Sequence, residues 1–381
     1  MNAFGILTPG RILFGRGAAA KAPALIAALG PRGVLVHGTN PARAAWLLDG
    51  LRAQGAAVQP LPCPGEPTLP MLETAVAAAR AFGAQWVAGL GGGASLDLAK
   101  AVAALVPAPG GAMDHLEVVG RGLPLIAAPL PFVAIPTTSG TGAEATKNAV
   151  IGLPDHGRKV SLRDDRMLAR IAIVDPALTD RCPRAVTLAS GLDAVTQVIE
   201  PYLSCKATPY TDALTLPAIG TGLAALIRLM QAEDEQARDE LAWVSLCGGL
   251  ALANAGLGAV HGLAGVIGGL TGAAHGAICG ALLAPVLAAN RAAVPPQGAA
   301  AARIARVCEI IATALGTAPA DAPAALGAWV QSAGLPRLSA LGLRPQDHAA
   351  VATAALAASS MQGNPVALGV ADLQAILARA G

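Results

Sequence analysis

The segment QWVAGLGGGASLDLAKAVA, residues 85–103, passes from a short apolar run through three glycines into a helical pattern. It predicts a strand at residues 85–90, a turn at residues 91–95 and a helix that starts near Leu96. Glycines let a ligand approach the backbone, and the first N–H groups of a helix favour an anion such as a pyrophosphate. The turn is not GxGxxG, however, and glycines also end strands for steric reasons. The segment therefore predicts a strand and a helix and leaves ligand binding open.

The sequence on both sides continues this alternation of strands and helices. It predicts further strands at residues 11–15, 33–37, 57–60, 132–135 and 170–174, a polar hairpin-like segment at residues 153–163, and helices at residues 18–29, 42–54 and 69–82. Such alternation is typical of a doubly wound, parallel α/β sheet with helices on both faces. From about Pro183 the pattern is helical. We therefore predict an α/β domain at residues 1–182 and an all-α domain at residues 183–381.

A second turn, rich in glycine and hydroxyl groups, follows the predicted strand at residues 132–135. Its sequence is PTTSGTG, residues 136–142. Ligands of open parallel sheets bind beyond the carboxyl ends of the strands, where both turns are expected. Two such turns favour a nucleotide site, and the alternative is a loop capped by Ser and Thr side chains.

Residues 243–290 lie within the longest run without Lys, Arg, Asp or Glu and contain His261 and His275, each followed by glycine. A buried imidazole needs a partner for its nitrogens, since an unpaired buried polar group costs about 1–3 kcal/mol. That partner is either a backbone carbonyl or a shared metal ion. Asp193, in an apolar helix, is either an oxygen ligand for this metal or a charge favoured by the helix dipole. Gln197 lies one turn after Asp193 on the same helix face.

The composition excludes several classes of protein. The run at residues 243–290 is long enough for two membrane-spanning helices, but its eleven glycines and two histidines favour buried helices in a large domain. A net charge of +2 with scattered arginines gives no basic patch of the kind that binds nucleic acids. Six cysteines form no CxxC pair, and the N-terminus lacks a secretory signal pattern. We therefore expect a reducing, cytoplasmic compartment and neither a membrane nor a nucleic-acid partner.

Four motifs resemble signatures of the iron-containing (group III) alcohol dehydrogenases. They are GGGASLDLAKAVA from Gly91, PTTSGTGAEAT from Pro136, GLDAVTQVIEPYLS from Gly191 and LGAVHGLAGVIGGLTGAAHGA from Leu257. The resemblance runs in register from about residue 10 to the SMQGNPV segment at Ser360. It implies a Rossmann-type dinucleotide-binding domain and an all-helical metal domain. It also implies hydride transfer between NAD or NADP and a small alcohol, aldehyde or ketone, whose oxygen a divalent metal, iron or zinc, polarises.

The resemblance implies roles for individual residues. The residues of the pyrophosphate turn and of the helix after it correspond to Gly91, Gly92, Gly93, Ser95 and Asp97. The second cofactor turn corresponds to Thr137, Thr138 and Ser139. The residues at the ribose and nicotinamide end of the cofactor correspond to Asn148 and Lys159. Three of the four metal ligands correspond to Asp193, His261 and His275.

Cofactor choice depends on the end of the second strand, where an acidic residue would select NAD. Here Gly38 and Asn40 occupy that end, with Arg43 nearby. Without a carboxylate to repel it, a 2′-phosphate is tolerated and Arg43 can pair with it, which favours NADP. If Gly38 is simply a turn residue, both cofactors bind.

Two positions depart from the family pattern. Gln197 replaces the usual fourth ligand, a histidine, and an amide oxygen is a weaker ligand than imidazole. Gly265 replaces a histidine implicated in proton transfer, so the sequence names no catalytic acid. The metal site is therefore expected to be weakened.

Three functions remain open at this point. The first is a metal-dependent alcohol dehydrogenase or carbonyl reductase. The second is an enzyme resembling maleylacetate reductases, with little need for metal, and the third is a catalytically silent nucleotide-binding homologue. Members of the family are commonly dimers or larger, so a homodimer or larger homo-oligomer is expected.

Overall fold

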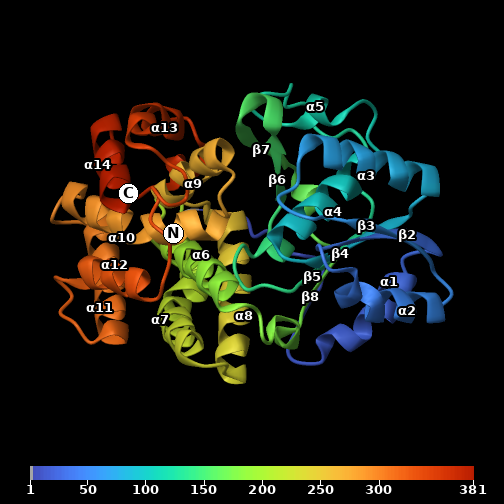
Figure 1. Ribbon diagram of the computed structural model, residues 1–381, viewed down its shortest axis with the longest axis horizontal. Coiled ribbons are helices and arrows are strands. Elements are labelled where there is room, and N and C mark those ends of the chain that lie inside the picture. The colour runs from blue at the N-terminus through green and yellow to red at the C-terminus, as the bar shows by residue number, and fades with distance from the viewer. Residues whose placement is uncertain (1–2) are drawn as a thin grey trace. The chain divides into compact units, whose positions relative to one another are not determined.

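The structure, a computed structural model, describes residues 3–381 and divides into two compact units (Figure 1). The α/β unit comprises residues 7–138 and 142–179. The helical unit comprises residues 3–6, 139–141 and 180–381. The short segment 139–141 thus belongs to the helical unit although it lies within the second glycine-rich turn. The periodicity of the sequence cannot predict that a segment within one unit's part of the chain belongs to the other unit.

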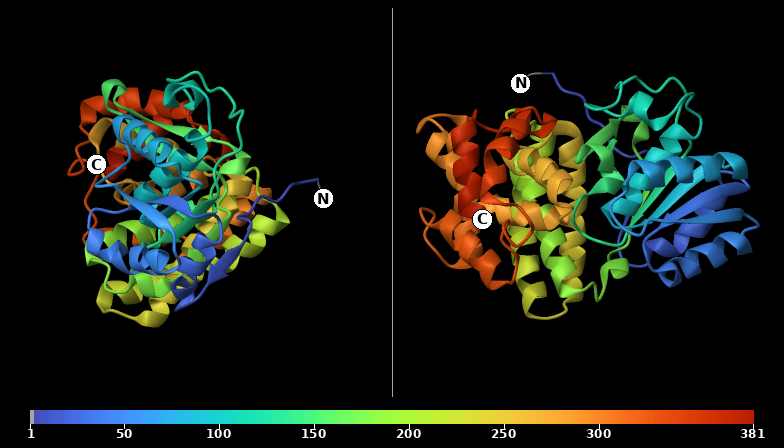
Figure 2. Two further views of the ribbon diagram at one scale, coloured as in Figure 1. Left: turned by 90° about the vertical axis from the view of Figure 1, so that its right-hand side faces the viewer. Right: turned by 45° about the horizontal axis from the view of Figure 1, so that its top comes forward.

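The α/β unit is built on a six-stranded sheet whose strand pairs are all parallel (Figure 2). The strand order is β1-β8-β5-β4-β2-β3. These strands are β1 (Ile12–Phe14), β2 (Arg32–His37), β3 (Ala57–Pro62), β4 (Trp86–Gly91), β5 (Phe132–Pro136) and β8 (Ile171–Val174). The predicted doubly wound parallel sheet is confirmed.

Alternate residues of each central strand enter different cores. Val34 and Val36 of β2 pack with helices α3 (Leu69–Phe82) and α4 (Gly93–Leu105). Leu35 packs with α1 (Ala22–Ala27) and α2 (Ala45–Ala53) on the opposite face. Figure 1 shows these two helix pairs on the two sides of the sheet. Because both faces are buried, the strands are continuous apolar runs without alternation.

The remaining elements of the α/β unit refine the predicted boundaries. Two predicted helices begin as 3₁₀ turns, Ala18–Lys21 and Pro41–Ala44. In the first of them, Pro23 lacks the N–H that an α-helix starting at residue 18 would need beyond its first turn. The hairpin is longer than predicted and pairs β6 (Asn148–Leu153) with β7 (Arg158–Arg163) in antiparallel fashion. The short helix α5 (Ala112–His115) is not predicted. The 3₁₀ helices of the described chain are Ala18–Lys21, Pro41–Ala44, Ala143–Ala145, Pro154–His156, Asp165–Met167, Pro176–Thr179, Pro345–Asp347 and Ser359–Gly363.

The helical unit confirms the predicted all-α half. Its helices are α6 (Arg184–Leu203), α7 (Pro209–Gln231), α8 (Glu235–Ala255), α9 (Ala259–Thr271), α10 (His275–Ala293), α11 (Ala299–Leu315), α12 (Ala322–Ser332), α13 (His348–Leu356) and α14 (Val370–Ala380). Helices α6, α7 and α8 pack on one another, and α10 packs against α6, α9, α12 and α14.

Helices α7 and α10 are each long and apolar enough to cross a membrane, and so is the pair α8 and α9 taken together, although that pair bends by 98°. In this protein their apolar residues contribute to one continuous core with the other helices. Helix α10 is surrounded by four helices of the same unit. Packing within the protein therefore accounts for the apolar run at residues 243–290.

A buried lysine joins α4 to the hairpin of β6 and β7. The Lys100 ammonium donates to three oxygens, each 2.8 Å from Nζ, which belong to the Ala143 carbonyl, the Thr146 hydroxyl and the Asn148 carbonyl. Burial lowers the pKa of Lys100 to about 8. All three ammonium protons have acceptors, so the lysine fixes the hairpin to the helix that follows the glycine turn.

Replacing this lysine tests its role in stability. In Lys100→Met, three oxygens lose this donor, although the Ala143 carbonyl still accepts from the Thr146 hydroxyl, and each buried group left unsatisfied costs about 1–3 kcal/mol. We expect the free energy of unfolding, measured by urea denaturation, to fall by about 3 kcal/mol or more. The control is Lys147→Met, because Lys147 pairs with the exposed Asp165 carboxylate at 2.6 Å, and exposed pairs contribute about 0–1 kcal/mol. Equal losses in the two variants would contradict this account.

Candidate active site

The turns that follow β2 and β4 meet where the winding of the sheet reverses. From β2 the chain continues to β3 on one side, whereas from β4 it continues to β5 on the other. Gly38 follows β2, and Gly91 ends β4. A Cβ on Gly91 would lie 3.6 Å from the Gly38 nitrogen, so the two turns are adjacent. Open α/β sheets bind their ligands at such a switch point.

The turn after β4 leaves no room for a side chain at Gly91 and little at Gly92. Helix α4 begins at Gly93 with Gly92 as its N-cap, earlier than the predicted start near Leu96. A Cβ on Gly91 would lie 2.5 Å from the buried Ser95 hydroxyl, and one on Gly92 would lie 3.2 Å from the Thr138 hydroxyl. The glycines therefore bring strand and helix close together. The first N–H groups of α4, which have no acceptor within the helix, remain for a ligand at this edge.

Other predicted cofactor residues support the same edge of the sheet. The Thr137 N–H donates to the Gly91 carbonyl at 2.9 Å and joins the second turn to the first. The Asp97 carboxylate accepts from the Val150 N–H at 3.0 Å and holds β6 against α4. Asn148 begins β6. These contacts therefore fix the backbone at this edge of the sheet, independently of any contact with a ligand.

The remaining predicted residues lie further from the glycine turns in sequence and already have partners. The Asn40 side-chain oxygen accepts from the Ala42 N–H at 3.0 Å and caps a 3₁₀ helix. The Arg43 guanidinium donates to the Leu178 carbonyl at 3.2 Å. Lys159 lies 3.6 Å from the Glu66 carboxylate.

One predicted cofactor residue belongs to the other unit. Ser139 is buried and lies in the segment 139–141 of the helical unit, while Thr137 and Thr138 lie in the α/β unit. Sequence reasoning grouped the three because they are consecutive.

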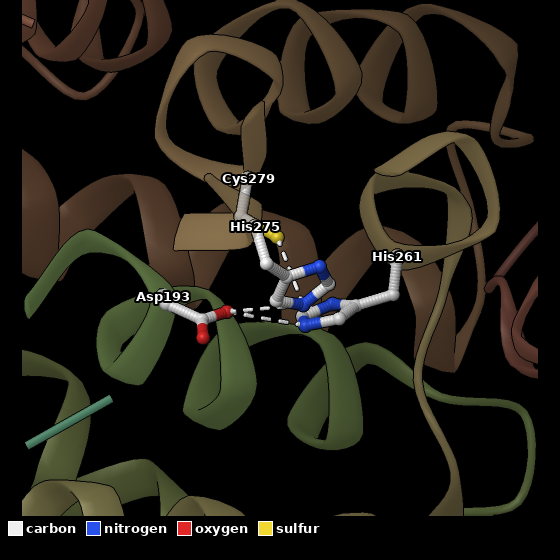
Figure 3. A group of neighbouring side chains, drawn as sticks. All are labelled: Asp193, His261, His275 and Cys279. Atoms are coloured by element: carbon white, nitrogen blue, oxygen red, sulfur yellow. Dashed lines mark hydrogen bonds and ion pairs between the residues drawn. The ribbon is translucent and has the colours of Figure 1, made fainter. Parts of the chain in front are cut away.

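The three predicted metal ligands converge in the helical unit, together with Cys279 (Figure 3). The Nε2 atoms of His261 and His275 lie 3.3 Å and 3.9 Å from the same oxygen, Oδ1 of Asp193. The Cys279 sulfur lies 3.6 Å from His275 Nε2. One ligand atom from each of the four residues lies within 4.8 Å of all the others. Helix α6 supplies the aspartate, α9 one histidine, and α10 the other histidine and the cysteine.

The glycine after each histidine permits this convergence. A Cβ on Gly276 would lie 2.5 Å from the Ala189 carbonyl oxygen of α6. A Cβ on Gly262 would lie 2.9 Å from the Met361 methyl carbon. Helix α10 therefore approaches the α6 backbone closely enough for His275 to reach across to the Asp193 carboxylate.

Glu200 determines which nitrogen of His261 faces the cluster. Its carboxylate accepts from the Val260 N–H at 2.7 Å and from His261 Nδ1 at 2.6 Å. Because Nδ1–H donates to this carboxylate, Nε2 keeps a lone pair, which faces Asp193 Oδ1. In the described chain both of these atoms are buried without a hydrogen-bond partner. Two such acceptors repel each other unless a proton or a cation lies between them, so the residues fit a metal ion.

The charges of the cluster also fit a cation. Burial favours the neutral forms, yet the charge on His275 holds the pKa of Asp193 below its ordinary value. Burial likewise opposes protonation of His275, but Cys279 and Asp193 raise the pKa of His275 to about 9. Without a metal, protons supply the positive charge that the buried carboxylate needs. A divalent ion would displace them.

Sequence reasoning missed Cys279 and Glu200. Cys279 lies four residues after His275, and Glu200 lies seven residues after Asp193, so both share a helix face with a predicted ligand. Those spacings are the signal that could have found them. Gln197, the doubtful ligand, donates from its side-chain nitrogen to the Gly140 carbonyl at 2.8 Å.

Comparison with known proteins now identifies the family. The model of iron-containing alcohol dehydrogenases matches residues 9–176, and that of the C-terminal part of the same family matches residues 187–381. The chain belongs to the iron-containing alcohol dehydrogenase family. The predicted family and enzyme class are thereby confirmed, and NAD(P) and a divalent metal are cofactors of this family.

Individual relatives support the assignment. "Probable alcohol dehydrogenase EutG" of Salmonella typhimurium is 33% identical over 88% of this chain and 83% of its own length. The protein of the same name from Escherichia coli is 36% identical over 65% of this chain, and that match spans 62% of the relative. The crystal structure of a 1,3-propanediol oxidoreductase superposes with a TM-score of 0.89 at 27% identity and covers 100% of both chains. The fold is therefore shared with this enzyme family.

The role of Glu200 leads to a prediction about metal affinity. In Glu200→Gln, His261 loses its charged partner, and loss of such outer contacts weakens metal binding on the order of 10–100-fold. Isothermal titration of the metal-free protein with zinc measures this change, and circular dichroism verifies the fold. The control Glu309→Gln alters only an exposed pair with Arg306 and should leave affinity unchanged. Unchanged affinity in Glu200→Gln would show that His261 needs no such orientation.

Proposed function

We propose that this protein is an NAD(P)(H)-dependent alcohol dehydrogenase or carbonyl reductase. It transfers a hydride between the nicotinamide and a small alcohol, aldehyde or ketone, and a divalent metal polarises the substrate oxygen. The observation that carries the proposal is the pair of buried atoms without hydrogen-bond partners, Asp193 Oδ1 and His261 Nε2, in a cluster with His275 and Cys279.

The proposal assigns one task to each half of the chain. Residues 1–182 bind the dinucleotide, with the pyrophosphate at Gly91, Gly92, Gly93 and Ser95 on the first turn of α4. The second turn, Asn148 and Lys159 serve the ribose and nicotinamide end. Residues 183–381 hold the metal through Asp193, His261 and His275, and they bind the substrate. When bound, the metal supplies Lewis-acid activation of the substrate oxygen.

The proton that accompanies the hydride has no donor at position 265. A Cβ on Gly265 would have no other atom within 4 Å, so this face of α9 is open beside the residue. We therefore assign the proton to solvent and name no catalytic acid.

A reductase with little need for metal is the second candidate. The bond from Gln197 to the Gly140 carbonyl favours it, because that side chain then supplies no imidazole in place of the usual ligand. The orphaned atoms of Asp193 and His261 favour the metal-dependent enzyme. A catalytically silent homologue would bind NADPH and turn over nothing.

We also propose a compartment, an oligomeric state and a preferred cofactor. We assign the enzyme to the cytoplasm as a homodimer or larger homo-oligomer, with NADP as the favoured cofactor. The absence of a carboxylate at Gly38 and Asn40 and the nearby Arg43 support that cofactor.

Removal of the metal separates the three candidates. After chelation we expect NADPH binding, followed by its fluorescence, to persist, because the glycine turns lie in the α/β unit and the metal cluster in the helical unit. Oxidation of NADPH with a panel of aldehydes and ketones should stop and return when zinc or iron is added. Activity that survives chelation would favour the metal-independent reductase, and no activity in either state would favour the silent homologue.

Cofactor preference tests the role of Arg43. We expect NADPH to bind more tightly than NADH, and Arg43→Ala to weaken NADPH on the order of tenfold, or about 1.4 kcal/mol, while NADH changes little. The control is Arg52→Ala, because Arg52 is an exposed arginine paired with Asp49. If NADH binds tenfold more tightly in the unaltered protein, the interpretation of the second strand's end is wrong.

A further inference from the structure

We propose that the thiolate of Cys279 is the fourth protein ligand of the metal and that the resulting oxygen, two-nitrogen and sulfur donor set selects zinc over iron. This inference rests on the proposed function, since it concerns the same metal, and adds a ligand and a metal preference.

Two distances in the cluster equal those expected of a tetrahedral site, and all four ligand atoms lie within 4.8 Å of one another. Zinc binds imidazole and carboxylate at about 2.0–2.2 Å and thiolate at about 2.3 Å, so tetrahedral ligand atoms are about 3.3–3.6 Å apart. The structure gives 3.3 Å between His261 and Asp193 and 3.6 Å between Cys279 and His275. His275 and Asp193 are 3.9 Å apart, slightly wider. A simple hydrogen bond from the thiol to His275 explains one of these distances, whereas a shared ion explains them together.

Cys279 is also placed as a ligand should be. It is fully buried and lies one helical turn after His275 on α10, so both side chains emerge from one face. Figure 3 shows its sulfur directed at the same point as the aspartate and the two imidazoles. A fully buried thiolate without a cation beside it is strongly disfavoured.

Gln197 is engaged elsewhere. Its amide nitrogen donates to the Gly140 carbonyl at 2.8 Å, and the Gly140 N–H donates to the Ser245 hydroxyl at 2.9 Å. A Cβ on Gly248 of α8 would lie 3.0 Å from the Gln197 Cβ, so the base of this side chain is tightly packed. Turning the amide toward a metal would leave a buried carbonyl unsatisfied. Cys279 therefore supplies the donor that the family's usual histidine position lacks.

The donor set determines the expected metal. Thiolate is a soft ligand that suits zinc, whereas imidazole and carboxylate serve several divalent metals. The carboxylate and the thiolate together neutralise the charge of a divalent ion. These four protein donors would hold the ion, which would supply Lewis-acid activation of the substrate oxygen.

Cobalt substitution tests the ligand directly, because a cobalt–thiolate bond gives a near-ultraviolet charge-transfer band that nitrogen and oxygen ligands do not. The chelated protein is titrated with Co²⁺ and its absorption recorded. We expect the band in the unaltered protein and in Gln197→Leu, together with visible bands of bound cobalt. In Cys279→Ser the charge-transfer band should vanish and zinc affinity should fall on the order of 10–100-fold or more, at least the scale of outer-contact losses.

A matched control and the contrary outcomes complete the test. Cys308→Ser alters another buried cysteine of the helical unit, on α11, and should leave spectrum and affinity unchanged. Visible bands without the charge-transfer band in the unaltered protein would overturn ligation by Cys279 and leave the proposed metal function standing. A charge-transfer band that survives in Cys279→Ser would also overturn it. Failure of the unaltered protein to bind cobalt or zinc would overturn both proposals. Tighter binding of Fe²⁺ than of Zn²⁺ would overturn the metal preference.

Discussion

A buried carboxylate surrounded by imidazoles is the constraint on which the helical unit depends. Asp193 is 1% exposed in the middle of an apolar helix, where an uncompensated charge would cost several kcal/mol. The charge of this carboxylate is compensated by the histidines of α9 and α10, so these two helices must approach α6 closely. Gly276 allows that approach, since any side chain there would collide with the α6 backbone. A glycine at position 276 is thus a requirement of the site, because it lets α10 approach α6.

The α/β unit depends on a different constraint, namely that its central strands are buried on both faces. Each strand divides its residues between two cores, so neither face can shift without exposing apolar surface. The carboxyl ends of β2 and β4 are fixed accordingly, and the glycine turn is held against α4. Lys100 and Asp97 extend the same rigidity to the hairpin through hydrogen bonds to its backbone. A rigid edge of this kind presents backbone N–H groups to an anion without a cost in ordering them.

The sequence predicted most of the fold for a physical reason. Strands buried on both faces are continuous apolar runs, and helix α3 has the predicted bounds, residues 69–82, where the structure shows a Thr68 cap at its start and Gly83 at its end. Residues 139–141 could not be assigned to the helical unit, because the bond from Gln197 to Gly140 joins positions 57 residues apart in sequence. Asp193, His261 and His275 could be grouped because polar residues in apolar helices need partners. Cys279 is itself apolar enough to pass as core, and Glu200 pairs with a residue 61 positions away.

Gln197 and Cys279 are best understood together. A histidine at 197 would place an imidazole one turn after Asp193, whereas the glutamine directs its amide to the backbone of residue 140 and fixes that segment between α6 and Ser245 of α8. The cluster then lacks one donor on the α6 side. The sulfur of Cys279 reaches the same centre from α10, one turn after His275, and gives the cluster four potential donors. Because thiolate is a softer donor than imidazole or carboxylate, its presence would change the relative affinity of the site for different metals. The side chain of Gln197 on α6 meanwhile supports the segment at residues 139–141 through its bond to the Gly140 carbonyl.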